Sequence, residues 1–245
     1  MKKTIGIAVV VIIFLSSCAH PAPDSIEKYP INVGSFIKQG GLKIDSKKIL
    51  SALDRGDSNV FQPIDEAPDT QLFSEQFEWS QADYEKIAKA VFQFVWKEPT
   101  DMWTLYRFKF DLMNCRDEPK GFNYADFFYY QEIKIDNKPL YSVRAISIEP
   151  QYGYIAWGGE TNYPHPIFGW KSVKLDELKV PAEEALGLAE SRGGQAFRLT
   201  RNNICSIVVT MYPESYSYGG WVVTYFPGDI HIHPLEIRIS GKRSK

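Results

Sequence analysis

The chain has 245 residues, 44% of them hydrophobic and 24% charged, which is long enough for one large domain or two small ones. Its formal net charge is −2, whereas a nucleic-acid-binding domain needs a basic face, so we expect no nucleic-acid partner. Aromatic residues make up 14% of the chain, and Tyr and Trp side chains can fill a core or form a contact surface.

The first residues have the pattern of an export signal. Lys2 and Lys3 precede an uncharged apolar run at residues 5–15. A membrane-spanning helix needs about 20 apolar residues, so this run fits the hydrophobic part of a signal peptide instead. The run ends in "LSSC", which resembles the lipobox of bacterial lipoproteins. The resemblance implies that residues 1–17 are removed and that Cys18 is lipidated as the new N-terminus.

Cleavage before Cys18 removes 17 of the 245 residues and leaves 228. The loss of Lys2 and Lys3 leaves 26 basic and 30 acidic side chains, a net charge of −4. We expect residues 18–34, which contain prolines, to form a tether that holds the body away from the membrane. Ala19 is compatible with sorting to the periplasmic face of an outer membrane in a Gram-negative cell; in other bacteria the cell surface is expected.

Residues 35–170 read as a first α+β unit. A short helix is predicted at residues 46–55 and a loop at 61–77. The clearest helix begins at Ser80, where Ser80 and Asp83 have the spacing of a capping box, and it ends before Pro99. Alternating apolar residues then predict four antiparallel strands, at residues 103–113, 122–135, 141–148 and 152–157.

Residues 171–245 repeat this order. Pro181 stands at the first turn of a predicted helix, which Gly193 and Gly194 end. Strands are predicted at residues 196–200, 205–211, 221–226 and 235–240. The sequence thus predicts an α+β fold of two tandem units, each a helix on an antiparallel sheet.

The second unit contains "PAEEALGLAESRGG", "CSIVVTM", "GGWVVTYF" and "LEIRIS". These segments resemble a PepSY-like module, which implies a cystatin/PepSY-like unit that has a binding or protease-restraining role and no catalytic residues. The mature region as a whole, with "WSQADY", "GFNYADF" and "NNICSI", is similar to uncharacterised bacterial lipoproteins. That second resemblance implies no activity.

Three cysteines occur in the chain. If Cys18 carries lipid, Cys115 and Cys205 remain as an even pair in an oxidising compartment, which favours a disulfide between them. Two separate buried thiols are the alternative.

Residues for catalysis are sparse. His231 and His233 form an H-x-H on a predicted strand, so both imidazoles would share a face. A metal would need a third ligand, for which only Asp229, Glu236 or the distant His165 is available. We therefore predict no metal site and no cofactor. The alternative is an envelope hydrolase that uses carboxylates or a metal held by these two histidines.

A tyrosine-rich segment joins two predicted strands and offers the best candidate contact residues, Tyr212, Tyr216 and Tyr218. These tyrosines either contact a partner or simply lie on a turn without a binding role. We expect a membrane-anchored, non-catalytic binding module of the cell envelope, whose partner is a protein, a peptide or an envelope polymer.

Overall fold

The computed structural model describes residues 36–65, 77, 79–112, 115, 121–135, 138–163, 173, 175–212 and 219–242. The chain divides into two units, Met1–Gly34 and Ser35–Lys245. The predicted signal peptide, Cys18 and the tether therefore lie outside the described residues. No helix in the described ranges is long and apolar enough to cross a bilayer.

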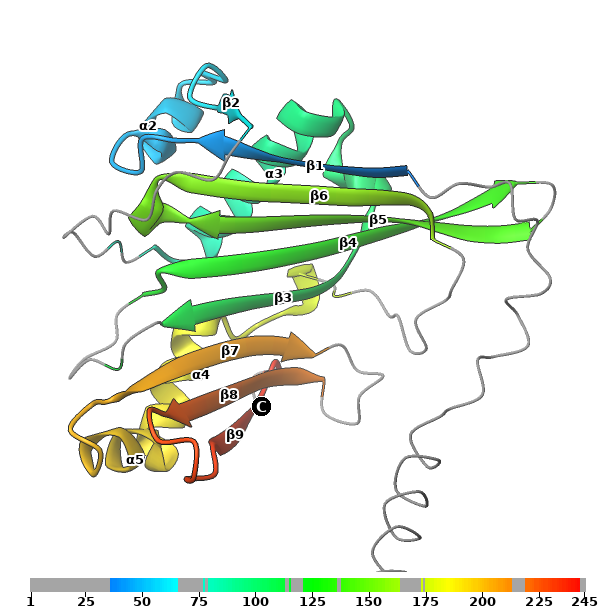
Figure 1. The fold of residues 1–245 in the computed structure, drawn as a ribbon. Helices are drawn as coiled ribbons and strands as arrows, with labels where there is room; N and C mark the ends of the chain where they lie inside the picture. Colours follow the sequence, from blue (N-terminus) through cyan, green and yellow to red (C-terminus); the bar gives the residue numbers. More distant parts are fainter. Residues whose placement is uncertain are drawn as a thin grey trace, which may run out of the picture. The chain divides into compact units, whose positions relative to one another are not determined.

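The described residues form one nine-stranded antiparallel sheet with the order β2-β1-β6-β5-β4-β3-β7-β8-β9 (Figure 1). The strands are β1 (Phe36–Lys43), β2 (Gln62–Ile64), β3 (Thr104–Leu112), β4 (Tyr124–Ile135), β5 (Lys138–Glu149), β6 (Tyr154–Tyr163), β7 (Cys205–Tyr212), β8 (Gly220–Pro227) and β9 (Leu235–Ser240). The α-helices are α2 (Ile49–Asp54), α3 (Gln81–Trp96), α4 (Ala182–Ala189) and α5 (Gln195–Leu199). Short 3-10 turns lie at Thr100–Met102, Pro150–Tyr152 and Leu175–Glu177.

Helix α3 begins as the sequence predicts. The Ser80 hydroxyl accepts a hydrogen bond from the Asp83 backbone N–H, and the Asp83 carboxylate accepts one from the Ser80 N–H, so the capping box is confirmed. Tyr84, Ile87 and Val91 recur at helical spacing and are fully buried against the sheet. Lys97 ends the helix in the left-handed conformation, at φ 59°.

The first turns of α3 and α4 are joined by side chains. The Gln81 side-chain oxygen accepts a hydrogen bond from the Ala182 backbone N–H at 2.8 Å. In return, the Glu183 carboxylate accepts one from the Gln81 backbone N–H. Each helix thus satisfies a backbone donor of the other, which fixes their relative position on the sheet.

The prediction of two tandem helix-and-sheet units is wrong, because β3 and β7 pair and merge all the strands into one sheet. Phe108, Phe110 and Leu112 of β3 lie opposite Met211, Val209 and Ile207 of β7. All six side chains are buried, so the pairing also joins the two hydrophobic faces. The Trp221 ring of β8 packs 5.3 Å from Phe108, edge to face, so one core runs across the junction.

The strand predicted at residues 196–200 is also wrong, because residues 196–199 belong to α5 and Thr200 caps its end. The turn between α4 and α5 has Gly193 at φ 116°, a conformation that favours glycine. A Cβ on Gly194 would lie 2.1 Å from the Tyr225 hydroxyl oxygen, so only glycine fits there. Five residues of alternating character cannot distinguish a strand from one helical turn. The sequence also did not predict β1, or β2 within the expected loop at residues 61–77.

Candidate binding surface on the helix-free face of the sheet

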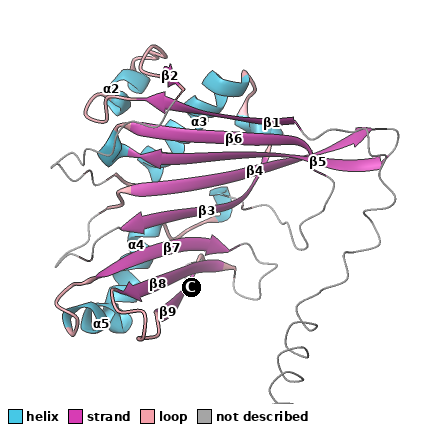
Figure 2. Ribbon diagram, in the orientation of Figure 1, coloured by secondary structure: helices cyan, strands magenta, loops and turns pink. Residues whose placement is uncertain are grey.

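The helices α3 and α4 lie behind the sheet in the view of Figure 2. Helix α5 packs Phe197 against Tyr225, a buried residue of β8, so it belongs to the same side. Successive strand residues point to opposite faces. Lys109 and Asp111 therefore lie on the other face from Phe108 and Phe110, which are buried under α3. In the described part of the chain no helix covers this second face, which we call the helix-free face.

A polar network of β3, β4 and β5 residues occupies the middle of this face. The Lys109 ammonium lies 3.2 Å from an Asp111 carboxylate oxygen and 3.1 Å from one of Asp126. The Tyr124 hydroxyl donates a hydrogen bond to Asp126 at 2.6 Å, and the Ser147 hydroxyl donates to the same oxygen. Side-chain exposure is only 8% for Asp126 and 16% for Asp111.

The electrostatics of this network depend on burial. Burial raises the pKa of Asp111, and the neighbouring Asp126 adds to the rise, although Lys109 opposes it. Burial and Asp126 likewise raise the pKa of Glu149 on the adjoining strand. Burial lowers the pKa of Lys109, but its two carboxylate partners outweigh that effect and the net shift is upward.

One oxygen of Asp111, Oδ1, is buried and accepts no hydrogen bond. A buried ion pair is at best about neutral for stability compared with well-packed apolar side chains. Stability alone therefore gives little reason to place charged groups here, and clusters of perturbed titratable groups mark functional sites more often than chance.

A row of aromatic side chains continues from the network along the same face. A β-bulge between Leu105 and Arg107 interrupts the pairing of β3 with β4. The Tyr106 ring centre lies 5.9 Å from those of both Phe128 and Tyr130, and Tyr130 lies 6.4 Å from Tyr141. The Arg107 guanidinium stacks 4.3 Å above the Phe128 ring. Arg107 is exposed and the four rings are half-buried.

The structure places Tyr212 on this same face. Met211, the preceding residue, is buried and pairs with Phe108, so Tyr212 is next in register to Arg107 at the end of the aromatic row. Tyr216 and Tyr218 lie outside the described residues. In the sequence, Arg107, Lys109 and Asp111 alternate with apolar residues, which indicates a solvated face of the strand, but no local pattern shows that Tyr124, Asp126 and Ser147 lie beside them.

His231 and His233 lie in the exposed connection between β8 and β9, not on a strand as the sequence predicted. The His231 backbone N–H donates to the Asp229 carboxylate at 2.9 Å. Within the described ranges, no three His, Cys, Asp or Glu side chains are grouped so that they could hold a metal ion.

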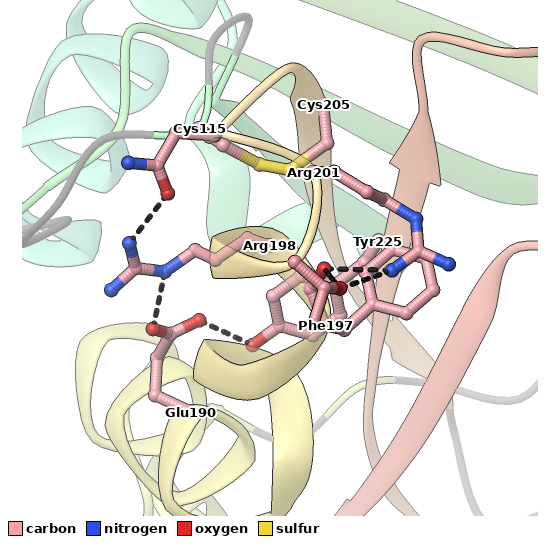
Figure 3. The surroundings of a disulfide bond; sticks show 9 residues. Cys115, Glu190, Phe197, Arg198, Arg201, Cys205 and Tyr225 are labelled. Carbon is pink, nitrogen blue, oxygen red and sulfur yellow. Dashed lines mark hydrogen bonds and ion pairs between the residues drawn. A yellow bond between two sulfur atoms is a disulfide. The ribbon is translucent and has the colours of Figure 1, made fainter.

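Cys115 and Cys205 form a disulfide, with their Cα atoms 5.1 Å apart (Figure 3). The Cys115 backbone N–H also donates to the Cys205 carbonyl at 2.7 Å, which continues the contact of β3 with β7. Beside it, the buried Arg198 guanidinium lies 2.7 Å from the Glu190 carboxylate, which accepts a 2.8 Å hydrogen bond from the Tyr225 hydroxyl. These bonds attach α5 to the end of α4 and to β8.

No protein-family model, curated protein or solved structure matches the chain. The resemblance of the C-terminal part to a PepSY-like module, and of the mature region to bacterial lipoproteins, therefore stays a prediction.

We expect the Cys115→Ala/Cys205→Ala variant to lose about 2–4 kcal/mol of the free energy of unfolding, because the disulfide closes a long loop in the unfolded chain. Urea unfolding of both proteins without reductant measures the difference. Mass spectrometry of protein made in an oxidising compartment should show the two peptides joined, and two freely alkylated thiols would contradict the pairing.

A second prediction concerns Asp111. Because its pKa is higher in the folded than in the unfolded chain, the folded chain binds the proton more tightly. The contribution of Asp111 to the free energy of unfolding therefore falls as the pH rises from the ordinary pKa of an aspartate to the raised pKa of the folded chain. The fall is at most about 1.4 kcal/mol per pH unit. The free energy of unfolding of wild type minus that of Asp111→Asn should fall across this window and stay level above it. A difference that rises with pH would refute this account of the network.

Proposed function

We propose that the protein is an exported lipoprotein, held at a membrane by lipid on Cys18, whose body binds a protein partner through the helix-free face and catalyses no reaction. The observation that carries the binding role is the aromatic row beside the buried polar network.

The anchor is supported by the N-terminal sequence. The signal peptide, with its short apolar run, is removed during export. The mature chain therefore has nothing to hold it at the membrane unless lipid is added. Stable anchoring requires more than one acyl chain, and a lipidated N-terminal cysteine supplies this. The compact unit Ser35–Lys245 then needs no membrane-spanning element of its own.

The choice of a protein partner rests on the composition of the aromatic row. Tyr, Phe and Arg are enriched at protein interfaces and supply most of their binding energy, because they bury large areas at small entropic cost. Tyr106, Arg107 and Phe128 form such a group, and Tyr130, Tyr141 and Tyr212 extend it. Charges of both signs at Arg107, Lys109 and Asp111 suit a mixed protein surface better than a polymer of uniform charge.

The polar network supports recognition better than catalysis. Both hydroxyls of the network, on Tyr124 and Ser147, donate to one oxygen of Asp126, and Lys109 contacts the other. The Asp126 carboxylate is therefore occupied by three donors. A carboxylate satisfied in this way is held rigidly with its three donors, which favours specific binding beside it.

The anchor is tested by Cys18→Ser. In cells fed a labelled fatty acid, the wild-type protein should carry label and sediment with membranes. The variant should carry no label and, if exported, should be recovered in the soluble envelope fraction. Label that persists on the Cys18→Ser variant would contradict attachment at this residue.

The binding surface is tested by photo-crosslinking in living cells. A photo-crosslinking residue at position 107 should give a discrete crosslinked product with another envelope protein. The matched control is position 43, since Lys43 is exposed on the helix-free face at the far end of the sheet, opposite Tyr154 of β6.

Substitutions that reverse the charge at the same two positions form a matched pair of variants. Arg107→Glu should lower capture of the crosslinked partner by soluble protein at least tenfold, as expected for an interface residue of this type. Lys43→Glu should leave the capture unchanged. Equal crosslinking at both positions, or equal capture by both variants, would show that the aromatic row is not the contact.

A further inference from the structure

Large apolar side chains that are exposed gather at one corner of the compact unit. Six large hydrophobic residues are exposed among those described, and Met102 is the one that lies elsewhere. The other five, which we call the apolar corner, are Leu199, Ile204, Phe226, Ile230 and Ile232. Ile230 is 92% exposed and Ile204 is 67% exposed. Soluble proteins seldom expose apolar side chains in such a group without a partner for them.

Backbone contacts bring these residues together. The Gly228 N–H donates to the Ile204 carbonyl at 3.2 Å, and a Cβ on Gly228 would lie 2.8 Å from an Ile204 methyl group. Phe226 is opposite Ser206, two residues beyond Ile204. Leu199 belongs to the same turn, since its carbonyl accepts a 3.1 Å hydrogen bond from Asn202. In Figure 1 the corner is the end of the sheet beside α5.

The corner stands on a rigid base. Cys205, which follows Ile204, is fixed by its disulfide with Cys115. Figure 3 shows Arg198 held by Glu190, which also accepts the hydrogen bond of Tyr225. The Arg201 guanidinium stacks 3.6 Å from the Phe197 ring centre. Leu199 and Ile204, which lie on this base, lose little conformational freedom on binding, and this favours a docking role.

We propose that the apolar corner inserts into the surface of a phospholipid bilayer, with Ile230 and Ile232 entering the boundary between headgroups and acyl chains. Ile230 lies in the middle of the connection between β8 and β9, so its exposure marks a projecting tip. A projecting aliphatic tip suits a soft bilayer better than a flat protein interface. His231 and His233 are the chain neighbours of Ile232 in the same connection and offer donors to lipid phosphates.

The inference rests on the proposed anchor only in that the lipid on Cys18 keeps the body near a bilayer. Phe36 is at the opposite end of the strands from Cys205, because β1 and β7 run antiparallel in the sheet. Six strand spacings of about 4.8 Å and one strand of about 27 Å separate Phe36 from the corner by about 40 Å. Residues 19–35 reach at most about 60 Å when extended, so lipid and corner can contact the same bilayer.

The test uses protein made from residues 19–245, which lacks the lipid but contains the whole compact unit. Flotation with vesicles of phosphatidylethanolamine and phosphatidylglycerol measures its partition coefficient. Burial of one isoleucine side chain changes an equilibrium constant by roughly tenfold or more. Ile230→Ser/Ile232→Ser should therefore lower partitioning at least tenfold, with an unchanged circular dichroism spectrum and melting temperature.

Met102→Ser is the matched control, because Met102 is 62% exposed on the turn after α3 and outside the corner. It should leave partitioning unchanged. The proposal is overturned if the wild-type protein does not float with vesicles, or if both variants float equally well. Self-association without lipid that Ile230→Ser/Ile232→Ser abolishes would also overturn it in favour of a second copy as the occupant. None of these outcomes depends on Cys18 or Arg107, so the proposed function stands or falls separately.

Discussion

The structure depends above all on the pairing of β3 with β7. After β3 the chain forms β4, β5 and β6, which lie on one side of β3 in the sheet. It then returns to pair β7 with the other edge of β3. Phe110 and Val209 lie opposite each other in the core, and Trp221 packs against Phe108 from the next strand but one. The disulfide of Cys115 with Cys205 continues the same junction covalently. Without the pairing of β3 with β7, the three C-terminal strands would have only a small hydrophobic core of their own, smaller than a stable domain usually needs.

The placement of the helices explains why the two faces of the sheet differ. Because α3 and α4 cap one another at Gln81, Ala182 and Glu183, both lie on the same face. The opposite face then has no helix over it in the described ranges, and its middle strands carry the polar network and the aromatic row. Burial of the Asp126 carboxylate on an uncovered face is possible because Lys109, Tyr124 and Ser147 surround it. The proposed partner surface is thus a consequence of helix placement.

Local features were predictable from the sequence, and long-range ones were not. The capping box at Ser80 and the strand alternation in residues 205–211 follow from nearest neighbours, so pattern reading finds them. The pairing of β3 with β7 joins residues about a hundred positions apart, and alternation shows a strand without showing its partner. For the same reason Lys109 and Asp111 were recognised as a polar face, while their contact with Asp126 was not. Residues 196–200 were misread because five residues carry too little periodicity.

The central claim, that one sheet and one core span both halves of the body, is tested most directly by native-state hydrogen exchange. If β3 and β7 are paired centrally, the protected amides of β3, β4, β7 and β8 should all exchange through the same global unfolding, at one common free energy. The paired residues around Phe110 and Val209 are the most informative. Exchange of β7, β8 and β9 at a clearly lower free energy, in a separate transition from β3 and β4, would contradict the account and restore two independent units.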